Sequence, residues 1–411
     1  MKMSSKYWMV LAAACGLAAS AVGICFNTNG LFYTPIAAEF GVGRGSVAMM
    51  SSIFSVASST MGMVTPHIIK PKSLKPLLFA ATILMAGSTA MFSLCNALLP
   101  LYLLCALRGL GCGICGFVTV TTLINNWFRK SHGVFTSIAM TFSGVPALVL
   151  SSLFTSVIQN AGWRTGFLAV AAAIVLFNLP ALLFPFTLRP QDSSMTAYGQ
   201  EEYEQFLRQN PTHVIRGRAP HFSFFSAEFA LAAGFTILVC IAAQFTQHFP
   251  AFAESKGFDS QFGALLLSTA MAGSVSCKLI YGTGADRFGN SKAMIMTAVL
   301  SLVSNFILLF TSARLTLQAG AFLCTVSAAN SSVGIALIAS DMFGAQNYSK
   351  GYPVISFMGS MIGALSGTLI GYMFDATGNY NVVLWTMAVV QALVIVCVIA
   401  AYRKKAASQA A

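Results

Sequence analysis

The chain has 411 residues and a net charge of +12, and 56% of its residues are hydrophobic while only 8% are charged. Ordinary soluble domains have about 25% charged residues, so this chain has too little polar surface to coat a water-soluble globule. The composition excludes a soluble domain and predicts a protein surrounded by a lipid bilayer.

Apolar segments recur along the whole chain, each long enough to cross the bilayer as a helix of about 20 residues. We predict twelve spans, near residues 8–31, 46–69, 74–95, 98–126, 133–158, 164–188, 227–251, 260–284, 292–312, 315–341, 351–374 and 380–402. Only residues 189–226 interrupt this rhythm, with charged, Pro and Gly residues. The sequence therefore predicts an all-α polytopic membrane protein with a six-helix bundle at 1–188, a cytoplasmic linker at 189–226 and a second six-helix bundle at 227–411.

The basic residues are distributed unevenly between the predicted loops. If both termini are cytoplasmic, the inside segments hold 17 Lys and Arg residues and the outside loops hold four. This is the positive-inside pattern. It predicts a multi-pass protein of the cell (inner or plasma) membrane with cytoplasmic termini. The net positive charge is then explained by the membrane topology and by attraction to anionic lipid, and no nucleic-acid partner is expected.

Motifs of enzymes and of processing sites are absent or incomplete. The sequence has no P-loop, no H-E-x-x-H and no G-x-S-x-G, and its five histidines lack metal-ligand spacing. All ten cysteines lie in predicted spans and are expected to be packing residues, not disulfides or metal ligands. The residues before Cys15 look like a signal cleavage region, but the apolar segment continues past them, so we expect no cleavage. No enzyme activity, cofactor or metal is predicted.

An internal repeat relates the two halves at an offset near 215 residues. The segment "NGLFYTPIAAEFG", residues 29–41, matches "QFTQHFPAFAESKG", residues 244–257, and aligns four polar or Pro pairs. These pairs are Asn29 with Gln244, Tyr33 with His248, Pro35 with Pro250, and Glu39 with Glu254. Parallel repeats of this kind place a transported substrate at the interface between the halves, so the first helix of each half is expected to line a shared cavity.

The segment "YGTGADRFGN", residues 281–290, matches the G-x-x-x-D-R-x-G loop signature of the major facilitator superfamily through Gly282, Asp286, Arg287 and Gly289. The chain therefore resembles that superfamily, and the resemblance implies that these four residues form a cytoplasmic gate. Asp286 at a helix end can pair with a cation or cap a neighbouring helix, while the glycines permit close approach and a turn. The equivalent loop of the first half lacks the D-R-x-G core.

Within the superfamily, the chain is similar to the oxalate/formate antiporter and monocarboxylate transporter families. Four segments carry this resemblance: "NGLFYTPIAAEFGVGRGSV", "LRGLGCGIC", "NNWFRKSHG" and "CKLIYGTGADRFG". In those families an arginine of the eighth helix pairs with the substrate carboxylate, and Lys278 stands at that position here. Ser274 replaces the aspartate that monocarboxylate transporters tend to carry one turn earlier, and the lysine of the oxalate/formate type is missing from residues 353–374.

Two cations, Arg108 and Lys278, fall inside predicted spans, where a charge near the bilayer centre costs at least about 2.5 kcal/mol. All eleven acidic residues lie in loops or at the ends of spans. We therefore expect the substrate to supply the counter-charge, with Arg able to bind a carboxylate through two hydrogen bonds. Structural alternatives are that Lys278, about six residues from its helix end, extends to the membrane surface, and that Arg108 bonds backbone carbonyls as a clamp.

Six neutral polar residues complete the predicted substrate site. These residues are Asn27, Asn29, Tyr33, Gln244, Gln247 and His248. They offer donors and acceptors around a cavity whose charge comes from Arg108 and Lys278, although each could instead bond a neighbouring helix.

Together these features predict a secondary transporter that moves a small organic anion, a mono- or dicarboxylate, by alternating access and by anion exchange. A proton-coupled monocarboxylate symporter is the main alternative, with His248 as the sole obvious proton carrier. A drug exporter and a transporter-like sensor are further alternatives. The expected partners are the anion and the lipid bilayer, with a monomer as one option for the oligomeric state.

Overall fold

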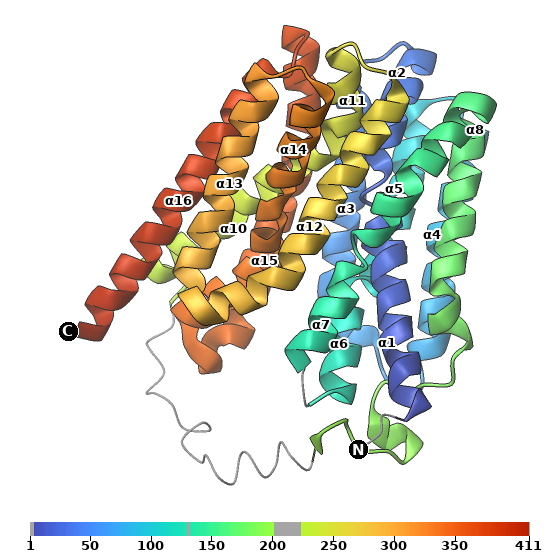
Figure 1. The fold of residues 1–411 in the computed structure, drawn as a ribbon. Coiled ribbons are helices and arrows are strands. Elements are labelled where there is room, and N and C mark those ends of the chain that lie inside the picture. The colour runs from blue at the N-terminus through green and yellow to red at the C-terminus, as the bar shows by residue number, and fades with distance from the viewer. Residues whose placement is uncertain (1–3, 130–131, 201–222, 411) are drawn as a thin grey trace. The chain divides into compact units, whose positions relative to one another are not determined.

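The computed structural model describes residues 4–129, 132–200 and 223–410. Side chains at 132, 133, 137, 279, 282–287, 345–346, 348–350 and 407–410 lie outside this description. The described residues form helices, and the one extended pairing among them is an isolated bridge between Phe128 and Tyr198 (Figure 1).

The α-helices of the first half are α1 (Ser5–Ala18), α2 (Tyr33–Phe40), α3 (Arg44–Ile68), α4 (Leu74–Met91), α5 (Leu98–Cys115), α6 (Phe117–Trp127), α7 (His132–Thr141) and α8 (Val145–Leu183). Those of the second half are α10 (Ala227–Gln244), α11 (Phe249–Ser255), α12 (Ser260–Phe288), α13 (Asn290–Phe310), α14 (Arg314–Cys324), α15 (Ile335–Thr377) and α16 (Asn381–Ala410). Short 3₁₀ or π segments connect several of them. These segments are Ala19–Ile24, Asn29–Phe32, Phe92–Leu94, Pro190–Ser193, Phe245–His248, Thr325–Ala329 and Asn330–Gly334.

Ten helical segments among the described residues are long and apolar enough to cross a membrane. One of them, Val134–Leu183, contains Gly162 with a φ of 80°, which breaks α8 into two helices and gives two crossings. Helix α12 adds a further crossing through its length of 29 residues. The described chain thus has the twelve predicted crossings and no sheet, and the predicted all-α polytopic fold is confirmed.

By packing, the described chain separates into two compact units. The first consists of Met1–Phe26, Ala57–Pro146 and Arg164–Arg218, and the second of Asn27–Val56, Ala147–Trp163 and Ala219–Ala411. Residues 27–56 and 147–163 therefore pack with the helices of the second half of the sequence. The division of the sequence into bundles at 1–188 and 227–411 stays a prediction.

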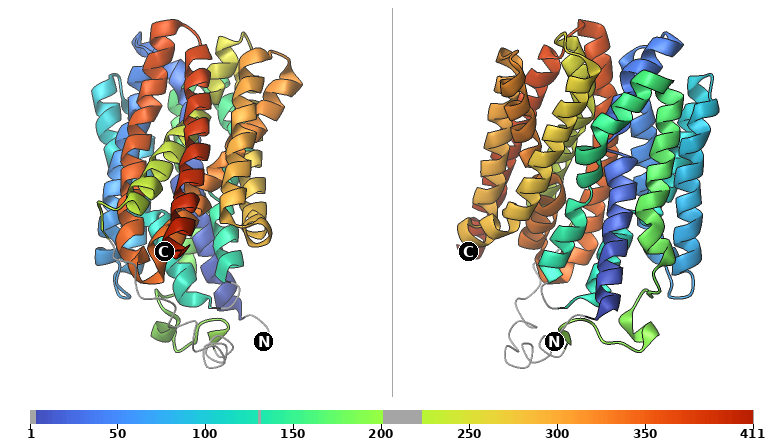
Figure 2. Two further views of the ribbon diagram at one scale, coloured as in Figure 1. Left: turned by 90° about the vertical axis from the view of Figure 1, so that its left-hand side faces the viewer. Right: turned by 45° about the vertical axis from the view of Figure 1, so that its right-hand side comes forward.

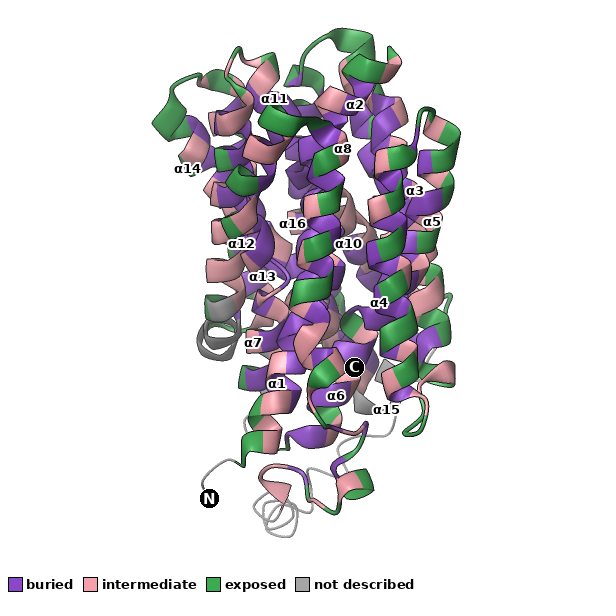
Figure 3. Ribbon diagram, turned by 90° about the vertical axis from the view of Figure 1, so that its right-hand side faces the viewer, coloured by how far each residue is buried: buried purple, intermediate pink, exposed green. Residues whose placement is uncertain are grey.

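Within the second unit, α13 packs beside α16, and α10 packs against α15 (Figure 2). Their inward faces bury aromatic and aliphatic side chains such as Phe235, Met294 and Val394. The opposite face of α16 exposes Trp385 and Val389, and α4 exposes Phe79 in the first unit. Figure 3 shows exposed residues at intervals along α4. Exposed apolar faces of this kind suit contact with lipid, since hydrocarbon chains surround a membrane helix.

Helix breaks occur at equivalent places in the two halves and support the internal repeat. The first span is interrupted by a turn at residues 25–28 and a 3₁₀ segment at Asn29–Phe32, and its counterpart by a 3₁₀ segment at Phe245–His248. The fourth span breaks at Gly116, and its counterpart passes through 3₁₀ and π turns from Thr325 to Gly334. Transporters form their binding sites from such discontinuous helices.

The breaks free backbone carbonyl groups, and nearby hydroxyl groups bond to them. The Thr119 hydroxyl donates to the carbonyl oxygen of Ile114 beside the break at Gly116. The Ser301 hydroxyl of α13 donates to the carbonyl oxygen of Cys324 at 3.0 Å, where α14 ends. These bonds matter because an unpartnered backbone group in hydrocarbon costs several kcal/mol.

Two pairs of glycines in the left-handed region mark the same repeat. Gly41 and Gly257 have φ values of 63° and 85°, and Gly162 and Gly378 have values of 80° and 70°. The two glycines of each pair end equivalent spans and lie 216 residues apart. The offset is 215 before this point and grows by one because "EFG" in the first half corresponds to the longer "ESKG" in the second half. Glycine is favoured at such positions because it has no β-carbon to clash with the backbone.

The beginning of the predicted linker folds onto the first unit. Tyr198 pairs with the end of α6, its amide donating to the Trp127 carbonyl at 2.8 Å and its carbonyl accepting from the Arg129 amide at 2.9 Å. The Tyr7 hydroxyl of α1 donates to the Thr196 carbonyl at 2.9 Å, and the rings of Tyr7 and Tyr198 lie 5.6 Å apart. Residues up to Tyr198 are thus part of the first unit's packing.

Candidate functional site

Several of the predicted polar residues lie together in the second unit, where the broken first and seventh spans approach each other. Asn29 Nδ2 donates to Ser51 Oγ at 3.1 Å, and the Tyr33 hydroxyl lies 2.8 Å from the same oxygen. Ser51 belongs to α3, so this hydroxyl ties the 3₁₀ segment and α2 to the neighbouring helix. The Tyr33 ring packs edge-to-face on the His248 imidazole at 5.4 Å between ring centres.

His248 is fully buried and bonded through both ring nitrogens. Its Nε2 lies 3.1 Å from the Gly367 carbonyl oxygen of α15, which can only accept, so Nε2 carries the hydrogen. In the neutral tautomer Nδ1 is then an acceptor, and it lies 3.4 Å from the Tyr380 hydroxyl. His248 therefore connects the seventh span to α15 and to the start of α16 through hydrogen bonds.

Gln247 is 1% exposed, and neither Nε2 nor Oε1 of its amide has a hydrogen-bond partner among the described residues. Its backbone lies against Gly30, where a β-carbon would come within 1.9 Å of the Gln247 carbonyl oxygen. A buried amide without partners costs about 1–3 kcal/mol. This side chain is the strongest indication in the second unit of a group that bonds something other than the protein.

The remaining two neutral residues lie at the edge of this group. Asn27 is half-buried in the turn at residues 25–28. Gln244 is half-buried at the end of α10, and a β-carbon at Gly367 would lie 3.4 Å from its Oε1. The glycine thus leaves room for Gln244 beside α15.

The two predicted cations belong to different units. Arg108 lies on α5 in the first unit, is 1% exposed, and places its guanidinium 5.1 Å from the centre of the Phe92 ring. This distance is within the range of a cation–π interaction. Lys278 lies on α12 in the second unit and is half-buried, with Ser274 buried one turn before it.

The depth of Lys278 differs from the expectation. Helix α12 continues to Phe288, so Lys278 lies ten residues from the helix end, or about 15 Å by helical rise, and not six residues. The difference arises because "YGTGADRF" continues the helix, although its glycines predict a loop. A lysine this far from the end is less able to reach the surface than the sequence suggested.

The predicted gate residues lie at the end of α12. Gly289 has a φ of 88° and separates α12 from α13, as expected for a turn glycine. For Gly282, Asp286 and Arg287 the structure describes the helical backbone only. Their assignment to a cytoplasmic gate therefore stays a prediction.

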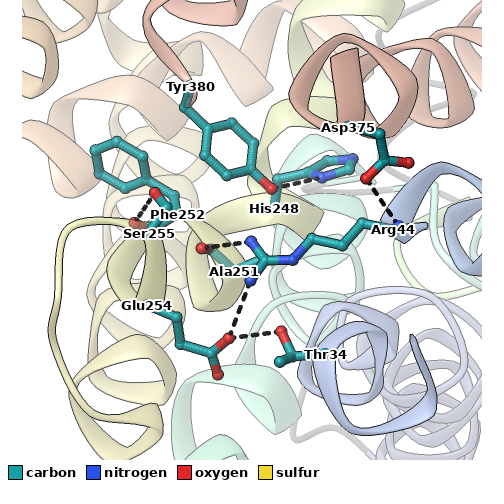
Figure 4. Close-up of polar contacts among 9 residues, drawn as sticks. All are labelled: Thr34, Arg44, His248, Ala251, Phe252, Glu254, Ser255, Asp375 and Tyr380. Carbon is teal, nitrogen blue, oxygen red and sulfur yellow. Dashed lines mark hydrogen bonds and ion pairs between the residues drawn. The ribbon is translucent and has the colours of Figure 1, made fainter. Parts of the chain in front are cut away.

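Sequence reasoning missed a charged cluster in the second unit, drawn in Figure 4. Arg44, at the start of α3, lies 3.6 Å from Glu254 of α11 and donates to the Ala251 carbonyl at 3.0 Å. Thr34 of α2 donates to the same Glu254 carboxylate at 2.6 Å, and Asp375 of α15 accepts from the Arg44 backbone amide at 3.0 Å. The internal repeat, which aligns Glu39 with Glu254, could have indicated that Glu254 has a role. No sequence pattern indicated a role for Asp375.

Among the described residues, no group of His, Cys, Asp or Glu could hold a metal ion. The ten cysteines are unpaired thiols, seven of them buried and three half-buried.

Broken spans, buried polar side chains and an internal repeat define a polytopic helical transporter fold. The sequence matches the Major Facilitator Superfamily over residues 15–282 and 260–411. The chain belongs to the Major Facilitator Superfamily and is a membrane transporter.

Its relatives include monocarboxylate transporter 13 of Rattus norvegicus, which is 25% identical over 384 residues, covering 91% of this chain and 84% of the relative. Monocarboxylate transporter 11 of Homo sapiens is 24% identical over 288 residues, covering 68% of this chain and 56% of the relative. These matches confirm the resemblance to monocarboxylate transporters.

Solved structures show the same fold at low sequence identity. The nucleoside transporter NupG covers 97% of this chain and 100% of its own with a TM-score of 0.70, and the D-xylose-proton symporter covers 96% and 97% with a TM-score of 0.74. Both are 12% identical to this chain, so the likeness concerns the fold alone.

Proposed function

We propose that this transporter moves a small organic anion, a mono- or dicarboxylate, by alternating access, and that it exchanges one anion for another. In this proposal both termini are cytoplasmic and the protein lies in the cell (inner or plasma) membrane as a monomer. Arg108, Lys278 and the six neutral polar residues bind the anion. The segment from Gly282 to Gly289 acts as the cytoplasmic gate.

The position of Lys278 is the observation that carries the proposal. It lies ten residues inside α12, and Arg108 is 1% exposed within α5, so both positive charges are in the interior of spans. Acidic residues within the spans lie near their ends, as Glu254 and Asp375 do. An interior with this charge favours an anion over a cation as the solute.

The similarity to monocarboxylate transporters supports the substrate class. A monocarboxylate has a negative charge and two acceptor oxygens, which lysine and arginine bind by charge-assisted hydrogen bonds. Gln247 adds an amide donor and acceptor for uncharged parts of the substrate.

Anion exchange is favoured over proton symport by the surroundings of His248. Both of its nitrogens are engaged, one with the Gly367 carbonyl and the other with the Tyr380 hydroxyl. Taking up a proton at Nδ1 would require the Tyr380 hydroxyl to rotate so that its oxygen accepts, and it would place a positive charge on a ring that is fully buried. An imidazole in this setting acts as a hydrogen-bonding residue between helices.

A two-stage experiment tests the proposal. Purified full-length protein is first screened by thermal shift against mono- and dicarboxylates and against lipophilic cations, since a ligand of the folded state raises its melting temperature. The carboxylates that bind are then tested for counterflow in proteoliposomes. Carboxylate binding with counterflow is expected. Shifts by lipophilic cations alone would identify a drug exporter, and binding without counterflow would identify a sensor.

A further inference from the structure

Two contacts in the second unit are related by the internal repeat and differ in their chemistry. At the offset of 216 residues, Arg44 corresponds to Ser260, and these residues begin α3 and α12. At the same offset, Asp375 corresponds to Gln159. Each contact joins the start of one span to the end of a span from the other half of the sequence.

The first contact is charged. The Asp375 carboxylate accepts from the backbone amides of Arg44 at 3.0 Å and Gly45 at 2.8 Å. These amides begin a helix, where the partial positive charge of the helix terminus stabilises a carboxylate. The Arg44 side chain extends the contact to Glu254 at 3.6 Å (Figure 4). Its guanidinium also lies 4.4 Å from the centre of the Phe374 ring.

The second contact is neutral. Gln159 donates to the Ser260 hydroxyl at 2.6 Å and accepts from Gln261 Nε2 at 2.8 Å. Gln261 also donates to the Ser156 hydroxyl at 3.1 Å. No charged side chain takes part in these bonds, so the two contacts share their position in the repeat but not their electrostatics.

Glycines allow the charged contact to form at close range. A β-carbon at Gly43 would lie 2.4 Å from the Asp375 carboxylate, and one at Gly45 would lie 2.4 Å from the Tyr372 ring. Two turns further along α3, the Ser52 hydroxyl lies 2.6 Å from that of Thr368. The start of α3 and the end of α15 are therefore packed together from Gly43 to Ser52.

We propose that the Asp375 contact, together with the Arg44–Glu254 ion pair, is a latch that holds this end of the second unit closed and limits how often it opens. We call the end where these residues lie the Arg44 end. The proposal rests on the proposed transport function, because alternating access requires this end to open and close. The neutral contact at Gln159 guides the approach of the helices but does not limit opening.

The test measures whether a cysteine introduced at position 52 becomes accessible in the full-length protein. Ser52 is 5% exposed, and the ten native cysteines are buried or half-buried, so the protein that keeps Ser52 gives the background. The probe is a charged, membrane-impermeant methanethiosulfonate reagent. Its rate of reaction with the Ser52→Cys protein reports how often α3 and α15 separate.

In the Ser52→Cys background, Asp375→Asn is expected to raise the labelling rate about fivefold, the effect of losing one carboxylate at a helix start. Glu254→Gln is also expected to raise the labelling rate. Asp375→Glu keeps the carboxylate, and its labelling rate is expected to stay near that of the parent. Gln159→Ala is the matched control, and its rate is expected to stay within about twofold because Gln159 is exposed and water replaces its bonds.

The salt dependence of the labelling rate distinguishes an electrostatic latch from a contact that only supports the fold. Asp375 is exposed and Arg44 and Glu254 are 17% and 22% exposed, so ions screen these charges. Raising the ionic strength from roughly 0.05 to 0.5 M should speed labelling of the parent, and should speed it less in Asp375→Asn, which keeps only the Arg44–Glu254 ion pair.

Equal acceleration by Gln159→Ala and Asp375→Asn, or an unchanged rate in Asp375→Asn, would overturn the latch. If Asp375→Asn does not fold, Glu254→Gln and the salt dependence of the parent decide the question. Labelling needs no substrate. A protein that shows no counterflow with any carboxylate but labels as expected would reject the proposed function and leave the latch standing.

Discussion

A β-carbon at Gly371 would lie 2.6 Å from the α-carbon of Gly45, so the backbones of α15 and α3 touch directly at the Arg44 end. Backbone atoms cannot move aside as a flexible side chain can, and the two helices would have to separate. Small residues at such points let membrane helices approach closely. Substitution here therefore tests the closed packing without changing any charge.

Gly371→Ala is expected to lower the maximal rate of counterflow at least about tenfold and to speed labelling in the Ser52→Cys background, because overpacking costs about 1–3 kcal/mol. Gly87→Ala on α4 is the matched control, since nothing lies within 4 Å of a β-carbon there. Counterflow kinetics and labelling of the two variants are compared. A Gly371→Ala protein with normal counterflow would show that this contact is not kept during transport.

Lys278→Gln is expected to abolish counterflow while leaving expression and melting temperature near those of the parent. The reason is that the variant removes the positive charge that lies deepest in α12. Lys278→Arg keeps the charge and should retain part of the activity. Lys404→Gln, at an exposed position of α16, is the control. Parent-level uptake by Lys278→Gln would place the lysine outside the binding site and favour its extension to the membrane surface.

Gln247→Met is expected to raise the melting temperature by about 2–4 °C and to weaken substrate affinity about tenfold. The substitution removes a buried amide without partners and keeps a similar volume, so the folded state loses a cost of about 1–3 kcal/mol. Gln391→Met should lower the melting temperature, because Gln391 Nε2 donates to Ser301 at 3.0 Å. Differential scanning fluorimetry and counterflow provide the two readouts. A lower melting temperature for Gln247→Met would mean that its amide supports the fold.

Uptake into liposomes preloaded with a cognate anion is expected to exceed uptake into empty liposomes greatly, and a pH gradient alone should drive little accumulation. In the proposed exchange the bound anion accompanies the positively charged site as it reorients, so a site without an anion is expected to reorient poorly. The measurement compares preloaded and empty liposomes with and without the gradient. Strong pH-driven uptake into empty liposomes that is lost in His248→Ala would instead identify a proton-coupled symporter.

Local sequence patterns were sufficient for the spans and for the repeat. Hydrophobic length predicts each crossing independently of the others. The pairing of Asn29 with Gln244 and of Tyr33 with His248 predicted that the first and seventh spans end alike, but the 3₁₀ interruptions of these spans were not predicted. The sequence did not reveal that α12 continues through its glycines to Phe288, since tertiary packing can override helix propensity.

The Arg44 cluster was beyond prediction from a single sequence. Asp375 and Arg44 are separated by 331 residues, and no periodic pattern connects an acid at one helix end to amides at another helix start. The unpartnered state of Gln247 depends in the same way on which groups pack around it. The type of a polar residue and the span that contains it can be predicted from the sequence, whereas its exact depth and its partners depend on the assembled fold.

The pairing of Phe128 with Tyr198 has a consequence for dividing this protein into separately produced polypeptides. Trp127 and Phe128 are fully buried, and the Tyr198 ring and backbone contribute to that burial. A first polypeptide ending at residue 188 would lack the Tyr198 ring beside Phe128 and the amide that bonds the Trp127 carbonyl, and the aromatic surface that this exposes promotes aggregation. Split versions for complementation, and insertion points for reporter domains, should therefore carry the first fragment past Tyr198.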